Sequence, residues 1–172
     1  MNAKQIIELL RLTPHPEEGG FFSETYRCAE GLEADVLPGR YCGSRSFGTA
    51  IYYLLTPETM SALHRLQSDE MFHWYAGGSV RMLHLYPDGR GAEVLLGNDL
   101  ASGQRPQVLV PRGVWQGACL EPGAEYALLG CTVAPGFAYE DYEHGRRSAL
   151  TSQYPDHAAL IARLTTEENH AE

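Results

Sequence analysis

Apolar residues at helical spacing occur near both ends of the chain. In AKQIIELLRL, residues 3–12, Ile6, Leu9 and Leu10 fall on one face, and the TPHP that follows stops a helix because proline has no amide donor. DHAALIARL, which follows Pro155, repeats the pattern. The spacing predicts an N-terminal helix within residues 1–13 and a C-terminal helix within residues 155–165.

Between these helices the pattern changes to short runs rich in Val, Tyr, Leu and Thr. Gly, Pro, Asn and Asp interrupt the runs, as in the turn sequences PDGRG and EPGAE. The predicted strands cover residues 20–27, 49–55, 61–66, 71–76, 80–86, 92–97, 107–111, 114–120 and 125–133. Such a series is typical of an all-β sandwich or barrel. Residues 28–48 are expected to form an excursion that covers a barrel mouth or reaches a partner subunit.

Length and charge narrow the class of protein. The 172 residues fit one domain, residues 1–172, with its β core at residues 20–135, and such a chain can bury a core without disulfides. The net charge of -9 and the lack of a Lys/Arg cluster argue against a nucleic-acid partner. Charged residues interrupt the apolar N-terminal segment, so neither a membrane span nor a secretory signal is expected, and we predict a cytoplasmic protein.

HRLQSDEMFHWYAGG, residues 64–78, combines histidines, acids and aromatic residues. Successive side chains of a strand alternate between its faces. Glu70 therefore shares a face with Phe72 and Trp74, and His64 can converge with it, whereas His73 points elsewhere. On the inward face, Phe72 and Trp74 would be core residues or the apolar wall of a site for a ring-shaped ligand.

GGFFSETYR, residues 19–27, is a second candidate for the site. Simple alternation puts Glu24 and Tyr26 on one face with Phe22. If this face meets the interior, Glu24 and Tyr26 join the ligand-binding residues. The alternative is a solvated edge strand.

The spacing of His64, Glu70 and Gly77 resembles the first cupin motif, in which two histidines, a glutamate and a glycine frame a metal pocket. Leu66 stands where the second histidine would be. PRGVWQ, residues 111–116, resembles the second cupin motif, with Gln116 where its histidine would be. Two of the four usual ligands are therefore present.

Longer segments extend the resemblance over nearly the whole chain. PHPEEGGFFSETYR, SALHRLQSDEMFHWYAGG, VLVPRGVWQG and CTVAPGFAYEDYE are similar to the cupin-5 family, also called DUF985. The resemblance implies a cupin jelly roll, a homodimer, and sugar-nucleotide epimerases and small-molecule binders as the nearest functional analogues. EEGG has one residue more than the commoner EGG form, which affects only the local turn.

His64, Glu70 and Gln116 are the candidate metal ligands, for Zn, Ni, Fe or Mn. They offer a single imidazole, and an amide oxygen is a weak donor to transition metals, so we expect that no metal is required although a divalent ion could bind. Without a metal, a neighbouring carboxylate could make His64 a general base, with Gln116 holding a substrate oxygen. Tyr26, Tyr52 and Tyr53 are candidate acids.

Three interpretations of this cluster stay open. One is a cupin that binds a small polar molecule, sugar-like or nucleotide-like, without catalysis. Another is a sugar epimerase or isomerase in which His64 is the catalytic base and Glu70 its catalytic partner. In the third, His64 and Glu70 form only a structural polar pair, because buried polar groups must find partners in any fold.

Overall fold

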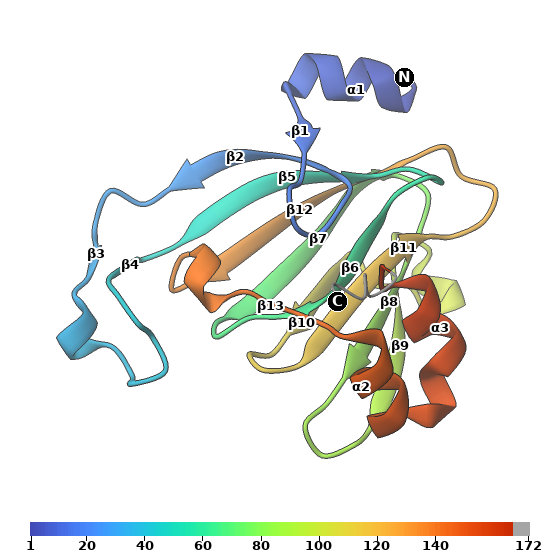
Figure 1. The fold of residues 1–172 in the computed structure, drawn as a ribbon. Helices are drawn as coiled ribbons and strands as arrows, with labels where there is room; N and C mark the ends of the chain where they lie inside the picture. The colour runs from blue at the N-terminus through green and yellow to red at the C-terminus, as the bar shows by residue number, and fades with distance from the viewer. Residues whose placement is uncertain (167–172) are drawn as a thin grey trace, which may run out of the picture.

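The computed structural model describes residues 1–166, so residues 167–172 of the predicted domain lie outside the described part. Two antiparallel sheets face each other and form a jelly roll (Figure 1). One sheet has the order β1-β2-β5-β12-β7-β10 and the other β13-β6-β11-β8-β9. The predicted all-β cupin fold is confirmed.

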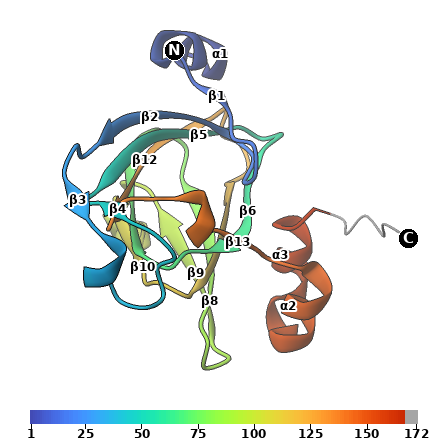
Figure 2. The same cartoon turned by 60° about the vertical axis from the view of Figure 1, so that its left-hand side comes forward.

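Every predicted strand is present, with bounds that differ from the predicted ones by at most two residues. These strands are β2 (Phe21–Arg27), β5 (Thr49–Leu55), β6 (Met60–Arg65), β7 (Asp69–Gly77), β8 (Val80–Leu85), β9 (Gly91–Leu96), β10 (Gln107–Val110), β11 (Trp115–Leu120) and β12 (Ala127–Ala134). Two-residue strands are added at β1 (Thr13–Pro14), β3 (Gly31–Leu32), β4 (Arg45–Ser46) and β13 (Glu143–His144). β3 and β4 pair with each other in the 28–48 excursion, which projects from one end of the jelly roll in Figure 1 and comes forward in Figure 2.

The N-terminal helix α1 (Ala3–Leu10) lies inside its predicted range. Asn2 and Gln5 form a reciprocal capping box that satisfies otherwise unpaired amide groups at its start. Ile6 is buried and packs with Leu54 on the outer side of the larger sheet. The helix therefore covers part of the outer face of that sheet and lies outside the space between the two sheets.

The C-terminal region forms two helices where the sequence predicts one. α3 (Ala158–Arg163) follows a 3-10 turn (Pro155–His157) inside the predicted range, and α2 (Arg147–Gln153) was not predicted. Leu150 of α2 and Ile161 of α3 pack against Leu63 and Leu83 on the outer face of the smaller sheet (Figure 1). This second apolar layer supports β6 from behind.

The main core fills the space between the two sheets. Its fully buried members include Leu129, Met82 and Phe72, and apolar side chains of both sheets interdigitate there. Buried polar residues, among them His64, Glu70 and Gln116, interrupt this core. No helix in residues 1–166 has the length and apolar character needed to cross a bilayer.

Candidate functional site

β6 buries His64 on its inward face, with 1% of the residue exposed. Its Nδ1 lies 2.8 Å from the carbonyl oxygen of Ala62. Because a carbonyl only accepts, Nδ1 carries the proton, and Nε2 of the neutral ring is left with a free lone pair. Nε2 is fully buried and has no hydrogen-bond partner among residues 1–166. Burial lowers the pKa of His64, so the ring is neutral at neutral pH.

Glu70 and Gln116 meet in the interior from opposite sheets. Nε2 of Gln116, on β11, donates a 2.6 Å hydrogen bond to Oε2 of Glu70, on β7. Gln116 also lies opposite His64 in the pairing of β11 with β6. Burial, with a further contribution from the charge of Glu18, raises the pKa of Glu70 to about 7. The three residues that the sequence singles out therefore lie together.

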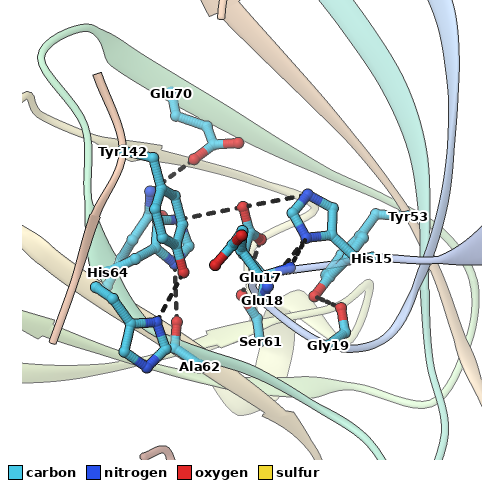
Figure 3. Close-up of polar contacts among 12 residues, drawn as sticks. His15, Glu17, Glu18, Gly19, Tyr53, Ser61, Ala62, His64, Glu70 and Tyr142 are labelled. Carbon is cyan, nitrogen blue, oxygen red and sulfur yellow. Dashed lines mark hydrogen bonds and ion pairs between the residues drawn. The ribbon is translucent and has the colours of Figure 1, made fainter. Parts of the chain in front are cut away.

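Two further residues, Glu18 and His15, complete the cluster and were not predicted. Oε1 of Glu18 lies 3.7 Å from Nε2 of His64 and 3.7 Å from Nε2 of His15 (Figure 3). Nδ1 of His15 accepts the backbone N–H groups of Glu17 and Glu18, so the proton of its neutral ring is on Nε2. Burial raises the pKa of Glu18 and lowers that of His15. Glu18 thus lies between an imidazole that can donate and one that can accept.

A glycine pair places Glu18 inside the jelly roll. Gly19 and Gly20 have φ values of 85° and 68°, in the left-handed region that residues with a Cβ rarely adopt. A Cβ on Gly19 would lie 2.7 Å from the carbonyl oxygen of Met60. The hydroxyl of Tyr53 donates to the Gly19 carbonyl at 2.8 Å. The loop before β2 therefore passes close to the neighbouring strands and directs Glu18 toward His64.

A cavity of about 210 Å³ lies beside this cluster. It is lined by His15, Glu18, Phe22, Glu24, Arg27, Thr49, Ile51, Glu70, Cys131, Val133, Phe137, Ala138 and Tyr139. Glu70 and Glu24 are the predicted site residues in this lining. His64 and Gln116 lie behind it, in contact with the carboxylates that form the wall.

The other predicted ligand-binding residues lie elsewhere. A bulge in the pairing of β2 with β5 falls between Glu24 and Tyr26, so Tyr26 does not share the face of Glu24 and is 55% exposed on the outer surface. Phe72 is buried in the main core. Trp74 packs against this core, and its indole N–H donates to the Gly78 carbonyl at 2.9 Å. The structure does not bring these three to the cavity.

The segment after β12 closes one side of the cavity. Phe137 and Tyr139 line it, and the ring of Tyr142 stacks on His64 with centroids 5.1 Å apart (Figure 3). Arg45 of β4 fastens this segment through two hydrogen bonds to Asp141, at 2.7 and 2.6 Å. Both side chains of this ion pair are 4% exposed. The 28–48 excursion therefore fixes the position of the segment that closes this side of the cavity, which we call the cover.

The residues at the cupin metal positions fit a metal ion poorly. Gln116 uses its amide N–H to bind Glu70, position 66 is an apolar leucine, and His64 has one free nitrogen. Within residues 1–166, no group of three or more His, Cys, Asp and Glu side chains is arranged to hold a metal. The predicted low-affinity metal site at His64, Glu70 and Gln116 stays a prediction.

Sequence comparison places the chain in a known family. Residues 4–145 match the Cupin_5 family, described as Cupin superfamily (DUF985). The chain belongs to this family. The resemblance predicted from its motifs is thus confirmed.

Relatives of this DUF985 cupin include proteins of known structure. The structure of protein SO0799 from Shewanella oneidensis is 36% identical, with a TM-score of 0.86 over 98% of this chain and 99% of that one. A hypothetical protein from Leishmania major is 34% identical, with a TM-score of 0.84 over 97% and 100% of the two chains. The uncharacterized protein YML079W of Saccharomyces cerevisiae is 31% identical over 81% of this chain and 73% of its own.

A more distant likeness concerns the fold alone. A variant of Bacillus subtilis oxalate decarboxylase is 15% identical, with a TM-score of 0.53 over 92% of this chain and 39% of that one. At this identity the likeness supports the cupin architecture of the DUF985 chain and says nothing about its chemistry.

Proposed function

We propose that this DUF985 cupin binds a small polar molecule, sugar-like or nucleotide-like, in the cavity beside Glu18 and Glu70. One observation carries the proposal: Nε2 of His64 is fully buried, has no hydrogen-bond partner in the part of the chain that the structure describes, and lies 3.7 Å from a carboxylate of the cavity wall. A buried polar atom without a partner is unfavourable in a purely structural core. A polar ligand that orders Glu18 would complete this network.

The cavity has the composition of a binding site for a small ligand. Polar groups such as Glu70, Thr49 and Arg27 are combined with apolar walls from Phe22 and Ile51. Its volume of about 210 Å³ is below the range of ~300–1,000 Å³ that holds drug-sized ligands. We therefore expect a ligand, or a ligand moiety, about as large as a single sugar ring.

A thermal-shift screen with sugars and nucleotides tests the proposal. A ligand present at 100 times its dissociation constant stabilises the folded state by about 2.7 kcal/mol, which raises the melting temperature. Ala138→Leu adds bulk to the cavity wall and should abolish the shift, whereas Ala101→Leu, at an exposed position outside the lining, should preserve it. If no probe shifts the melting temperature, or if the shift persists in Ala138→Leu, the proposal is wrong.

The protonation pattern favours one alternative function, a sugar epimerase or isomerase. In such a reaction, a C–H proton next to a carbonyl passes to Nε2 of neutral His64, which leaves an enolate and an imidazolium, and the protonated carboxyl of Glu70 gives its proton to a carbon of the enolate and becomes a carboxylate. Because Glu18 lies between the cavity and Nε2 of His64, the Glu18 side chain would have to move aside in the complex for this transfer. His64 is the base and Glu70 the acid in this scheme.

Hydrogen exchange separates binding from catalysis. A carbohydrate found in the screen is incubated with the protein in D₂O, and deuterium incorporation at carbon is followed by NMR. A catalyst incorporates deuterium, and His64→Gln should reduce the rate by at least ~100-fold, because general base catalysis contributes about that much or more. Binding without incorporation supports the non-catalytic function.

We also propose a homodimer that forms through the outer face of the larger sheet. Tyr26, Tyr75 and Leu109 are each about half exposed on β2, β7 and β10 of this sheet. Exposed apolar patches on folded proteins commonly mark interfaces. Light scattering should give the mass of two chains, and Leu109→Asp should shift it to one. We expect the dimer to act in the cytoplasm, where the four free cysteines, Cys28, Cys42, Cys119 and Cys131, would stay reduced.

A further inference from the structure

The cavity wall contains more acidic than basic groups. Glu18, Glu24 and Glu70 line it, and its basic residues are Arg27 and His15. A ligand should therefore carry a charge opposite to the charge that these five residues leave uncompensated.

Each of the three guanidinium nitrogens of Arg27 already has a hydrogen-bond partner. Its Nε and Nη2 donate to the two carboxylate oxygens of Glu24 at 3.1 and 2.7 Å, and its Nη1 donates to the carbonyl of Phe137 at 3.1 Å. A two-point contact of this kind satisfies both charges. Arg27 and Glu24 thus cancel, and an anionic ligand would have to break their pair to reach the guanidinium.

Glu18 and Glu70 have no comparable partner among the described residues. The hydrogen-bond donors that reach them are neutral: Gln116 and the Cys131 thiol for Glu70, and Ser61 for Glu18. The two imidazoles near Glu18, His15 and His64, are buried, and burial disfavours their charged form. Burial raises the pKa of both carboxyls and favours their protonated forms when no cation is near, so an ammonium group that replaces the proton would form a buried, paired charge.

An independent feature indicates that this wall receives a ligand. His64 is 1% exposed, and its unpaired Nε2 is directed at Glu18 rather than at another protein donor (Figure 3). Aromatic rings of Phe22, Phe137 and Tyr139 line the same cavity. Aromatic faces attract organic cations and do not favour phosphate groups.

We propose that the cavity is selective for a small organic cation, an amine-bearing molecule of about the size of one sugar ring, whose ammonium group pairs with Glu18 and Glu70. This inference rests on the proposed binding function and names the class of its ligand. Of the ligand types considered above, it favours amino sugars and excludes phosphate-bearing nucleotides from the cavity itself.

Two matched sets of probes test the charge preference. Glucosamine, glucose and glucose 6-phosphate differ in charge on one sugar ring, and benzylamine, benzyl alcohol and benzoate do so on an aromatic ring. Calorimetric titration at pH 7 should show that the amine of at least one set binds about tenfold more tightly than its neutral analogue, because charged hydrogen bonds are about twice as strong as neutral ones. The anions should not bind measurably.

Three variants connect this preference to the named residues. Glu70→Gln keeps the shape of the wall, and we expect it to reduce the amine preference to less than about threefold. Glu24→Gln releases Arg27, so glucose 6-phosphate or benzoate should gain affinity. Glu93→Gln changes the net charge equally, but Glu93 pairs with Arg81 on the outside of the sheet, and the preference should persist.

The outcomes separate the two proposals. If neutral and anionic probes bind as tightly as amines, the charge selectivity is wrong and small-molecule binding stands. If amines bind equally well to Ala138→Leu, their binding lies outside the cavity and the inference is wrong. If every probe and the wider screen fail to bind, the proposed function is overturned together with this inference.

Discussion

Glu18 and His64 face each other across the interior, with Oε1 3.7 Å from Nε2, although one lies in a loop and the other near the end of β6. The contact joins two titratable groups whose pKa values burial moves in opposite directions, upward for the acid and downward for the imidazole. Both groups are thereby shifted toward their uncharged forms, and their pKa values approach each other. Such convergence of pKa values is common where protons are bound or exchanged.

Glu70→Gln should change how stability depends on pH. The pKa of Glu70 is raised from 4.5 to about 7, so the folded protein keeps a proton that the unfolded chain releases. Its contribution is fully present below pH ~4.5 and is lost as the pH rises through about 7, a change of about 3 kcal/mol. Urea unfolding at pH 5 and pH 7.5 should show that Glu70→Gln removes this fall. An unchanged pH dependence would contradict the buried, protonated carboxyl.

His84→Gln should act at the acidic side with the opposite sign. His84 lies opposite Gln116 in the pairing of β8 with β11, and burial lowers its pKa from 6.5 to about 4. Below pH ~6.5 the unfolded chain binds a proton on His84, whereas the folded protein does not bind it until the pH falls to about 4. The unfolding free energy therefore decreases by about 3 kcal/mol as the pH falls toward 4. The variant should lose less stability than the wild type between pH 6.5 and pH 4.5. If the unfolding free energy of the variant falls with pH as steeply as that of the wild type, His84 is protonated in the folded state.

Gly19→Ala should impair binding more than it impairs folding. The added Cβ meets the Met60 carbonyl at 2.7 Å, and the φ of 85° is unfavourable for alanine, so we expect a loss of about 1–3 kcal/mol in unfolding free energy. The neighbouring Glu18 would move with the loop, and ligand affinity should fall by at least about tenfold. Gly39→Ala is the control, because a Cβ there has no neighbour within 4 Å. Equal effects of the two variants on affinity would count against the role of the loop.

Strand periodicity predicted the part of the site that lies on regular β-structure. Alternation correctly placed Glu70 on the inward face of β7 with Phe72, and it correctly allowed His64 to converge with Glu70, although both faces of β6 are buried. It failed for Tyr26, because the β2 bulge inserts a residue and reverses the faces beyond it. A bulge depends on pairing with a distant strand and leaves no signal in the alternation itself.

Glu18, His15 and α2 were missed for related reasons. Glu18 and His15 lie in a loop, and the direction of their side chains depends on contacts with residues far away in the sequence. The glycine pair at positions 19–20 was the available sequence signal, because it indicates a close approach to another strand. α2 has seven residues, a single buried residue in Leu150 and no side-chain cap at its start. Its stability comes from packing on the smaller sheet rather than from its own sequence.

Arg45→Met should loosen the cover of the cavity. The variant leaves Asp141 buried without its cation, which should reduce the unfolding free energy by about 3–5 kcal/mol, and addition of Asp141→Leu should restore most of the loss. Because Asp141 belongs to the segment that carries Phe137 and Tyr139, the single variant should also release ligand faster in stopped-flow measurements. Arg65→Met breaks the exposed pair with Glu143 and should cost about 1 kcal/mol or less. If Arg45→Met releases ligand at the wild-type rate, the ion pair stabilises the fold without controlling access.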